Sequence, residues 1–244
     1  MLGASVPTVS ARSSRQLHRH EARITSQNGE DGILGAIFET IGTTNRHAIE
    51  FGAGVGAVEC NSRRLVDEHG WTATWIDGAD QPIGSPVHRS IVTVENIERL
   101  FDALGAPAHP DLLSIDIDSN DYWVLDAVPP RYTPRVLVVE YNASLGPTDR
   151  LTIAYDPGFV WEVNDHFGAS LAALAAAADR RDLGLVGCDS RGVNAFFVAR
   201  AVLATIETFA ELTPEDGFVP CGYGLVENGR HVGFRRADRP FVRV

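Results

Sequence analysis

Oxygen-bearing side chains cluster where two apolar segments of the chain end. The segments, 112–117 and 135–139, are typical of buried strands. The side chains are Asp116, Asp118, Glu140 and Asn142. Because the carboxyl ends of parallel strands meet at one edge of a sheet, we expect these groups to converge there. Crowded carboxylates raise one another's pKa unless a positive group lies among them.

Two kinds of positive group fit this cluster: a cationic cofactor, or a hard divalent cation such as Mg²⁺ bound by these four oxygen ligands. A hydroxyl nucleophile needs a base or a metal to lose its proton at neutral pH. Asp116 is therefore a candidate catalytic base. The alternative is that the acids after residue 117 only cap the helix predicted at 122–128.

A glycine-rich segment follows a predicted strand at 47–51. It contains Gly52 and Gly54, and Glu50 precedes it. Such glycines let the backbone approach a ligand. The string also fits a loose dinucleotide pattern, so the glycines alone do not choose between NAD and S-adenosylmethionine. Glu50 favours the latter, since adenosylmethionine folds use an acid at this point. A turn without a ligand is the remaining alternative.

Further cofactor contacts are predicted after the next two strands. Asp77 ends the predicted strand 72–76, where a carboxylate can accept both ribose hydroxyls. Glu95 and Asn96 follow the predicted strand 87–94, at the adenine position of such folds. A solvated turn for Asp77 and helix capping by Asn96 are the alternatives.

An aromatic segment, 155–167, interrupts the alternation of strands and helices, and we expect it to form a lid over the site. Packing against the tail 202–244 is the alternative. His166 ends the segment and is a second candidate for the general base, although a lone histidine is more often structural. The aromatic side chains predicted to contact substrate are Tyr122, Tyr141, Tyr155 and Trp161.

The elements that must position these residues alternate along the chain. A helix is predicted from an N-cap at Ser26 to Ile41, with Gln27 and Glu30 in its first turn. These two side chains either cap the helix or bind the amino-acid end of the cofactor. Strands at 183–187 and 194–201 are joined by a turn too short for a crossover and must be antiparallel. The prediction is a Rossmann-like α/β fold of the class I methyltransferase type, a seven-stranded mostly parallel sheet with an antiparallel last strand.

The composition excludes several classes of protein. A net charge of −11 disfavours nucleic acid as a partner. No apolar run is long enough to span a bilayer, and three cysteines without a CxxC pair favour a reducing bacterial cytoplasm. The predicted organisation is an N-terminal extension, 1–25, a main domain, 26–201, with an insertion at 146–167, and a C-terminal cap, 202–244. The oligomeric state, including a homodimer, is left open.

Ordered motifs along residues 25–200 resemble the FkbM-type methyltransferases. They are SQNGEDGIL at 26–34, IEFG at 49–52, GW at 70–71, WIDG at 75–78, DLLSIDID at 111–118, NDYW at 120–123, VEYN at 139–142, GASL at 168–171 and GVNAFFV at 192–198. The resemblance implies cofactor contacts at Glu50, Gly52 and Asp77, with Asp116 and Glu140 near the reacting centre. Two departures are Gly54-Val55-Gly56 where an Asp-Gly is expected, and Ser119 in place of a glycine.

The resemblance implies a methyltransferase that uses S-adenosylmethionine to methylate a hydroxyl of a small molecule such as a sugar, nucleoside or natural-product intermediate, with Mg²⁺ as a candidate assistant. Two alternatives stay open. One is an NAD-linked oxidoreductase, and the other is a degenerate domain that binds cofactor or sugar without turnover.

Overall fold

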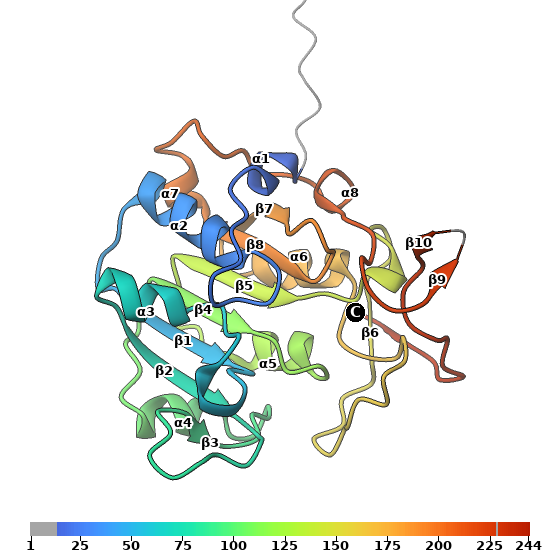
Figure 1. Cartoon of the computed structure of the whole chain (residues 1–244), viewed down its shortest axis with the longest axis horizontal. Helices are drawn as coiled ribbons and strands as arrows, with labels where there is room; N and C mark the ends of the chain where they lie inside the picture. Colours follow the sequence, from blue (N-terminus) through green and yellow to red (C-terminus); the bar gives the residue numbers. More distant parts are fainter. Residues whose placement is uncertain (1–13, 228) are drawn as a thin grey trace, which may run out of the picture.

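A seven-stranded sheet forms the centre of the computed structural model, which describes residues 14–227 and 229–244 (Figure 1). Its order is β3-β2-β1-β4-β5-β8-β7. Strand β8 is antiparallel to both β5 and β7, and the other neighbours are parallel. The strands are β1 (His47–Phe51), β2 (Thr72–Asp77), β3 (His88–Arg89), β4 (Leu112–Ile115), β5 (Val136–Glu140), β7 (Leu183–Cys188) and β8 (Asn194–Ala199). The predicted α/β class and mostly parallel seven-stranded sheet are confirmed.

Helices cover both faces of this sheet, which explains why its central strands are apolar on both sides. In β5, Val136 and Val138 pack on one face, and Leu137 and Val139 pack on the other. The first face carries α1 (Arg15–His18), α2 (Glu30–Ile41), α3 (Arg63–His69) and α7 (Arg200–Leu203). The second face carries α4 (Ile97–Ala103), α5 (Asp121–Ala127) and α6 (Leu171–Asp179). None of the described helices is both long and apolar enough to cross a membrane.

Several element boundaries differ from the prediction. Helix α2 begins at Glu30, after an N-cap at Gly29, rather than after Ser26; the Ser26 hydroxyl donates to the Asp31 carboxylate and accepts the Asp31 N–H. After the glycine-rich segment, only a short 3₁₀ turn, η1 (Val55–Ala57), forms before α3. Positive φ angles at Gly56 and Glu59 prevent a continuous helix there.

Strand β3 is two residues long rather than spanning 87–94, and β8 ends two residues early because α7 begins. The described part of the predicted N-terminal extension belongs to the fold. Leu17 of α1 is fully buried, and the Ser14 hydroxyl donates to Gly217 O. Residues 1–13 of the predicted extension lie outside the described residues.

The insertion and the C-terminal tail pair with each other. Strand β6 (Leu151–Thr152) is antiparallel to β11 (Val242–Arg243), and Asn164 forms a bridge with Arg235. The tail also contains α8 (Pro214–Gly217) and a small hairpin, β9 (Val226–Glu227) with β10 (Arg230–His231). In Figure 1 the insertion and the hairpin lie together on the right of the sheet.

Candidate functional site

A cavity of about 770 Å³ opens where the central strands end. Four strands place a residue in it: Gly52 after β1, Asp77 at the end of β2, Asp116 after β4 and Glu140 at the end of β5. This is the position where ligands bind in open α/β sheets. A volume of this size suits a cofactor together with a small second molecule.

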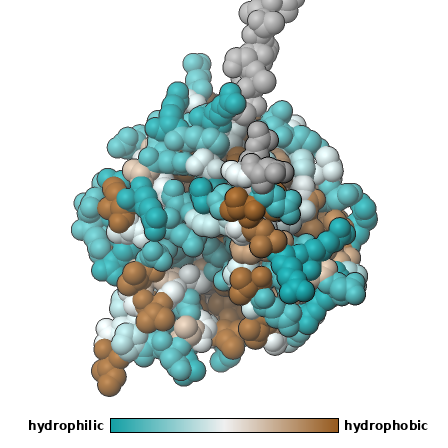
Figure 2. Space-filling view, turned by 45° about the vertical axis from the view of Figure 1, so that its right-hand side comes forward, coloured by the Kyte–Doolittle hydropathy of each residue, from teal (hydrophilic) through white to brown (hydrophobic). Residues whose placement is uncertain are grey.

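The other wall of the cavity is aromatic. Phe159, Trp161 and Phe167 come from the insertion, and Tyr223 and Phe234 come from the tail. Three further lining side chains, Val58, Ile91 and Val160, are each more than 60% exposed, so the rim is apolar. Figure 2 shows exposed apolar side chains gathered in the lower half of one face. The aromatic segment was expected either to cover the site or to pack against the tail. The insertion does both in part, since it lines the cavity and packs on the tail.

Gly52 sits where two chain segments approach closely. Its φ is 75°, and a Cβ built on it would lie 1.5 Å from the carbonyl oxygen of Asp116. Only glycine therefore lets the end of β1 lie against the end of β4. This contact fixes the glycine loop beside the acidic turn.

The carboxylate of Asp77 is held by the same loop. Its Oδ2 accepts the Gly54 N–H at 2.8 Å, and its Oδ1 accepts the Ala79 N–H at 2.7 Å. Each oxygen keeps a free lone pair for a further donor. Both Asp77 and Gly54 line the cavity, so this pair of predicted contacts lies where a cofactor could bind.

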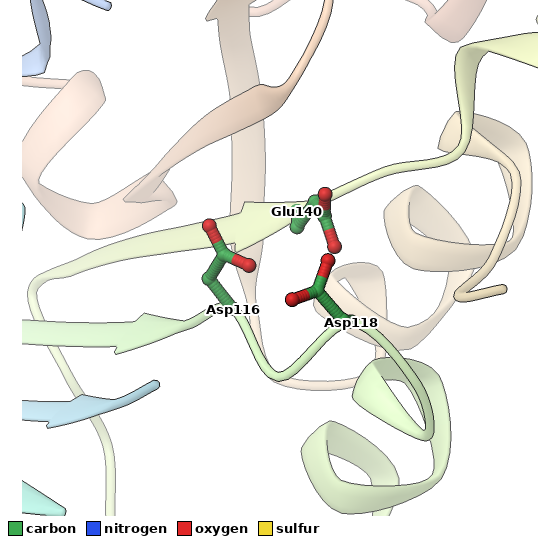
Figure 3. Close-up of side chains that lie close together, drawn as sticks. All are labelled: Asp116, Asp118 and Glu140. Atoms are coloured by element: carbon green, nitrogen blue, oxygen red, sulfur yellow. The ribbon is translucent and has the colours of Figure 1, made fainter. Parts of the chain in front are cut away.

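Three carboxylates meet on the floor of the cavity. Asp116, Asp118 and Glu140 each offer an oxygen, and these atoms all lie within 4.8 Å of one another. Figure 3 shows the three side chains pointing toward one another from the ends of β4 and β5. The Oε2 atom of Glu140 is buried and has no hydrogen-bond partner among the described residues. The predicted convergence of these three acids is confirmed.

The crowding raises the pKa of each acid. Burial, and then the charges of Asp118 and Asp121, hold the pKa of Asp116 well above its usual range. Burial, and then Asp116, have the same effect on the pKa of Glu140. The pKa of Asp118 is raised by burial and by Asp77. The cluster therefore retains a proton more readily than isolated acids and attracts cations.

Asp121 shapes the acidic turn from below. Its two oxygens accept the N–H groups of Ile117 and Ser119 at 2.9 and 3.0 Å. Burial raises its pKa to about 7, although these two bonds act in the opposite direction. Asp121 does not line the cavity, and its carboxylate orders the turn before α5 rather than capping the helix, which has no side-chain cap bond. Asp118 has a φ of 53°, which turns its side chain toward Glu140.

Glu50 and Glu30, both predicted cofactor contacts, lie outside the cavity. The Glu50 carboxylate accepts the N–H groups of Asn61 and Ser62, at 2.6 and 2.9 Å, and anchors the start of α3. Glu30 is fully buried and accepts N–H groups of its own turn and the Asn194 amide. Both carboxylates are thus engaged by the fold, whereas Gln27 does line the cavity.

The predicted adenine contacts also lie outside the cavity. Glu95 accepts the Tyr155 hydroxyl at 2.6 Å, and Asn96 accepts the Thr93 N–H at 2.9 Å. Tyr155 is absent from the lining as well, because its hydroxyl is turned toward Glu95. Ser90, Ile91 and Val92 line the cavity instead, because the strand predicted through 94 ends at Arg89.

Asn142 lines the same cavity as the three carboxylates, and its side chain is hydrogen-bonded to the backbone. Its amide nitrogen donates to the carbonyls of Asp165 and Phe167, and its oxygen accepts the Ser144 N–H. These bonds hold the insertion against β5. The role of Asn142 as a fourth metal ligand stays a prediction, since its oxygen accepts a single N–H group and keeps a lone pair.

His166 lies outside the cavity, so its position does not suit a general base there. Its ring packs between Phe159 and Phe241, and its Nε2 is 3.3 Å from Pro240 O. Its Nδ1 is buried without a hydrogen-bond partner in the described residues. Phe167, the next residue, lines the cavity in its place.

Of the remaining residues predicted to contact substrate, two line the cavity and one does not. Trp161 lines the cavity and packs against Phe167 and Phe234, with ring centroids 5.4 and 5.1 Å apart. Tyr141 lines it too, but its hydroxyl donates to Val219 O at 2.6 Å. Tyr122 is buried away from the cavity, beneath α6.

Sequence analysis missed several lining residues. They are Glu59, Ser119, Asn120, Ser144, Gly192, Cys221, Tyr223 and Phe234. Ser119 and Asn120 belong to the acidic motif and could have been included. The tail residues carry no local pattern that relates them to the sheet edge, and only long-range packing brings them there.

Comparisons with known proteins add no relative to this description. Neither a scan against models of protein families nor a search of curated proteins gives a match for this chain.

Proposed function

We propose that the protein is an S-adenosylmethionine-dependent methyltransferase of the class I type that methylates a hydroxyl of a small molecule. The observation that carries the proposal is one cavity in which a glycine loop, a strand-end acid and a carboxylate cluster follow β1, β2 and β4. The sheet order, with a reversed strand between β5 and β7, supports the same class. The usual dinucleotide fold lacks this reversed strand.

The residues present fit such a cofactor. Gly52 and Gly54 line the cavity, and Asp77 keeps lone pairs free for ribose hydroxyls. The unpartnered Glu140 oxygen and its acidic neighbours suit a cationic group. Bound S-adenosylmethionine supplies an electrophilic methyl carbon on a sulfonium sulfur.

The acids on the floor provide the proton acceptor. Asp116 is the side chain we assign to take the hydroxyl proton as the oxygen attacks, because it lies after β4 and lines the cavity. Its raised pKa makes it a stronger base than an isolated aspartate. Asp118 and Glu140 complete a set of oxygen ligands for Mg²⁺, which would lower the pKa of a bound hydroxyl.

Calorimetric titration with S-adenosylhomocysteine tests the cofactor, in EDTA and then in Mg²⁺. Micromolar binding is expected, and Asp77→Ala should weaken it at least about tenfold. Asp80→Ala is the matched control, since this acid is 88% exposed and pairs with Arg89 outside the cavity. Binding of NADH but not of S-adenosylhomocysteine would overturn the proposal in favour of an oxidoreductase.

The catalytic assignment has its own test. Asp116→Asn should lower turnover by about two orders of magnitude or more while leaving affinity for S-adenosylhomocysteine nearly unchanged. Full activity in this variant would remove Asp116 from the reaction. A dependence of turnover on Mg²⁺ that is lost in Glu140→Gln would assign the metal to the carboxylate cluster.

A further inference from the structure

The cavity has an unusual balance of charge. Five acidic side chains line it: Glu59, Asp77, Asp116, Asp118 and Glu140. Among the described residues, no arginine or histidine lines it, and the chain contains no lysine. Of these five, only Glu59 has an ion-pair partner within the described part of the chain, Arg23 at 3.6 Å, and both of these side chains are more than 60% exposed. The floor therefore has acids without compensating bases.

The aromatic wall faces the same space. Phe234 lies edge-on to both Trp161 and Phe167, with centroids 5.1 and 6.0 Å apart. On the same side, the guanidinium of Arg191 lies over the ring of Tyr223, 4.5 Å from its centroid. That contact shows one lining ring already taking a cation on its face. Aromatic faces and carboxylates are the two kinds of group that bind ammonium ions in proteins.

The cofactor alone does not balance this charge. S-adenosylmethionine carries a single net positive charge, and a divalent cation on the floor would still leave acids in excess. A phosphate or carboxylate on the acceptor would meet repulsion and find no arginine or histidine of the described lining. An amine would meet attraction from both walls.

We propose that the second molecule bound in this cavity is a hydroxylated small molecule that carries protonated amines, such as an amino sugar, and that anionic acceptors are excluded. The amine serves for recognition, and a hydroxyl of the same molecule accepts the methyl group. The identity of this acceptor as a substrate depends on the proposed function. The cavity's preference for a cation does not.

A matched pair of probes tests the preference. Kanamycin A carries amino groups and hydroxyls on linked rings, and its per-N-acetylated form keeps the hydroxyls but loses the charge. Calorimetry in EDTA, with and without saturating S-adenosylhomocysteine, should give at least about tenfold tighter binding of the amine form. Glucose 6-phosphate should not bind. Equal affinity for the two kanamycin forms would overturn the inference.

Variants separate the cavity from the general acidity of the chain. Asp118→Asn keeps the backbone conformation, because asparagine tolerates the positive φ of 53°. It should weaken kanamycin binding at least about fivefold, as should Trp161→Leu. Asp179→Asn removes the same charge from a 67% exposed side chain on α6 and should have no effect. An equal loss in Asp118→Asn and Asp179→Asn would show non-specific attraction and overturn the proposal.

The two proposals fail in different ways. If S-adenosylhomocysteine does not bind but the kanamycin pair differs as expected, the methyltransferase proposal falls and the cation site stands. If S-adenosylhomocysteine binds but the acetylated form binds as well as the amine, the cofactor assignment stands and the acceptor inference falls. Methyl transfer to kanamycin hydroxyls, detected by mass spectrometry, would support both proposals.

Discussion

Replacing Asp116 by Asn should stabilise the folded protein at neutral pH while it removes activity. Asp116, Asp118 and Glu140 bring oxygens within 4.8 Å of one another, and none of them forms an ion pair with a described residue. An amide at residue 116 removes one charge and adds a donor that Glu140 Oε2, now unpartnered, can accept. The change thus removes repulsion and supplies a hydrogen bond.

The size of the effect follows from the distance. Two unit charges at 4.8 Å repel by about 3.5 kcal/mol at an effective dielectric constant of about 20. Part of this cost is relieved in the folded protein, because burial and mutual repulsion raise the pKa of Asp116 and of Glu140. We therefore expect a gain of about 1 to 2 kcal/mol in the free energy of unfolding. This corresponds to a rise of about 2 to 8 °C in Tm.

The pH dependence has a definite sign. Because the pKa of Asp116 is higher in the folded chain than in the unfolded one, the folded state binds more protons above about pH 4. The stability of the wild-type protein therefore falls as pH rises through this range. The advantage of Asp116→Asn should be small at about pH 4, where roughly half of the unfolded molecules still carry the Asp116 proton, and should grow toward pH 7.5.

Thermal unfolding in EDTA at pH 4 and at pH 7.5 measures this difference. Asp179→Asn is the control, because it removes an exposed acid that pairs with Arg200, and its effect should be within about 1 kcal/mol at neutral pH. Millimolar Mg²⁺ should reduce the difference in stability between Asp116→Asn and the wild type, because it should stabilise the wild type alone. A variant that is less stable than wild type at pH 7.5 would refute the electrostatic reasoning.

Three further predictions concern the fold around the site. Gly52→Ala should lower the free energy of unfolding in urea by more than about 4 kcal/mol, because its Cβ would overlap the carbonyl oxygen of Asp116. Gly56→Ala, with a φ of 69° and open space around it, should lower it by only about 1 to 2 kcal/mol. Equal losses would contradict the close approach of Gly52 to Asp116. Ser170→Ala should cost about 1 to 2 kcal/mol in the same assay, since its hydroxyl caps α6, and no loss would show that the cap is dispensable. The pKa of Asp111 is lowered, because Arg135 and backbone N–H groups outweigh burial, which would raise it. The stability that the Asp111 carboxylate contributes is therefore present above about pH 4 and lost as pH falls. Asp111→Asn should cost about 3 kcal/mol in the free energy of unfolding at pH 7 and flatten the plot of stability against pH below pH 4. If stability below pH 4 depends on pH in the variant as it does in the wild type, Asp111 is not the group responsible.

The positions of the strands along the chain and the strand ends at which acids gather could be predicted from the sequence. Apolar segments and glycines repeat at the spacing of strands and turns, so all seven sheet strands were expected within a few residues, apart from the truncated β3. The carboxyl ends of parallel strands share one edge, which brings Asp77, Asp116, Asp118 and Glu140 to the cavity. These are local properties, because burial of a strand and the position of its last residue depend on near neighbours.

The directions in which individual side chains point depended on contacts between residues far apart in the sequence. Glu50 precedes the glycine loop but shares the strand face of Ala48, which packs toward α2 and α3, so its carboxylate meets Asn61 rather than the cavity. His166 and Phe167 are adjacent, yet only Phe167 faces inward, because His166 packs on Phe241 of the tail. A residue's type and spacing did not distinguish these cases.

The sequence by itself determined an α/β sheet with an acidic edge and a glycine-rich loop after its first strand. Tertiary structure decided which of the expected groups face one cavity, and it added Tyr223 and Phe234 from the tail to the aromatic wall. The reason is physical. The strands are recognised from runs of a few apolar residues, which are local. The cavity instead depends on pairing between β6 and β11, whose residues lie about ninety positions apart in the chain.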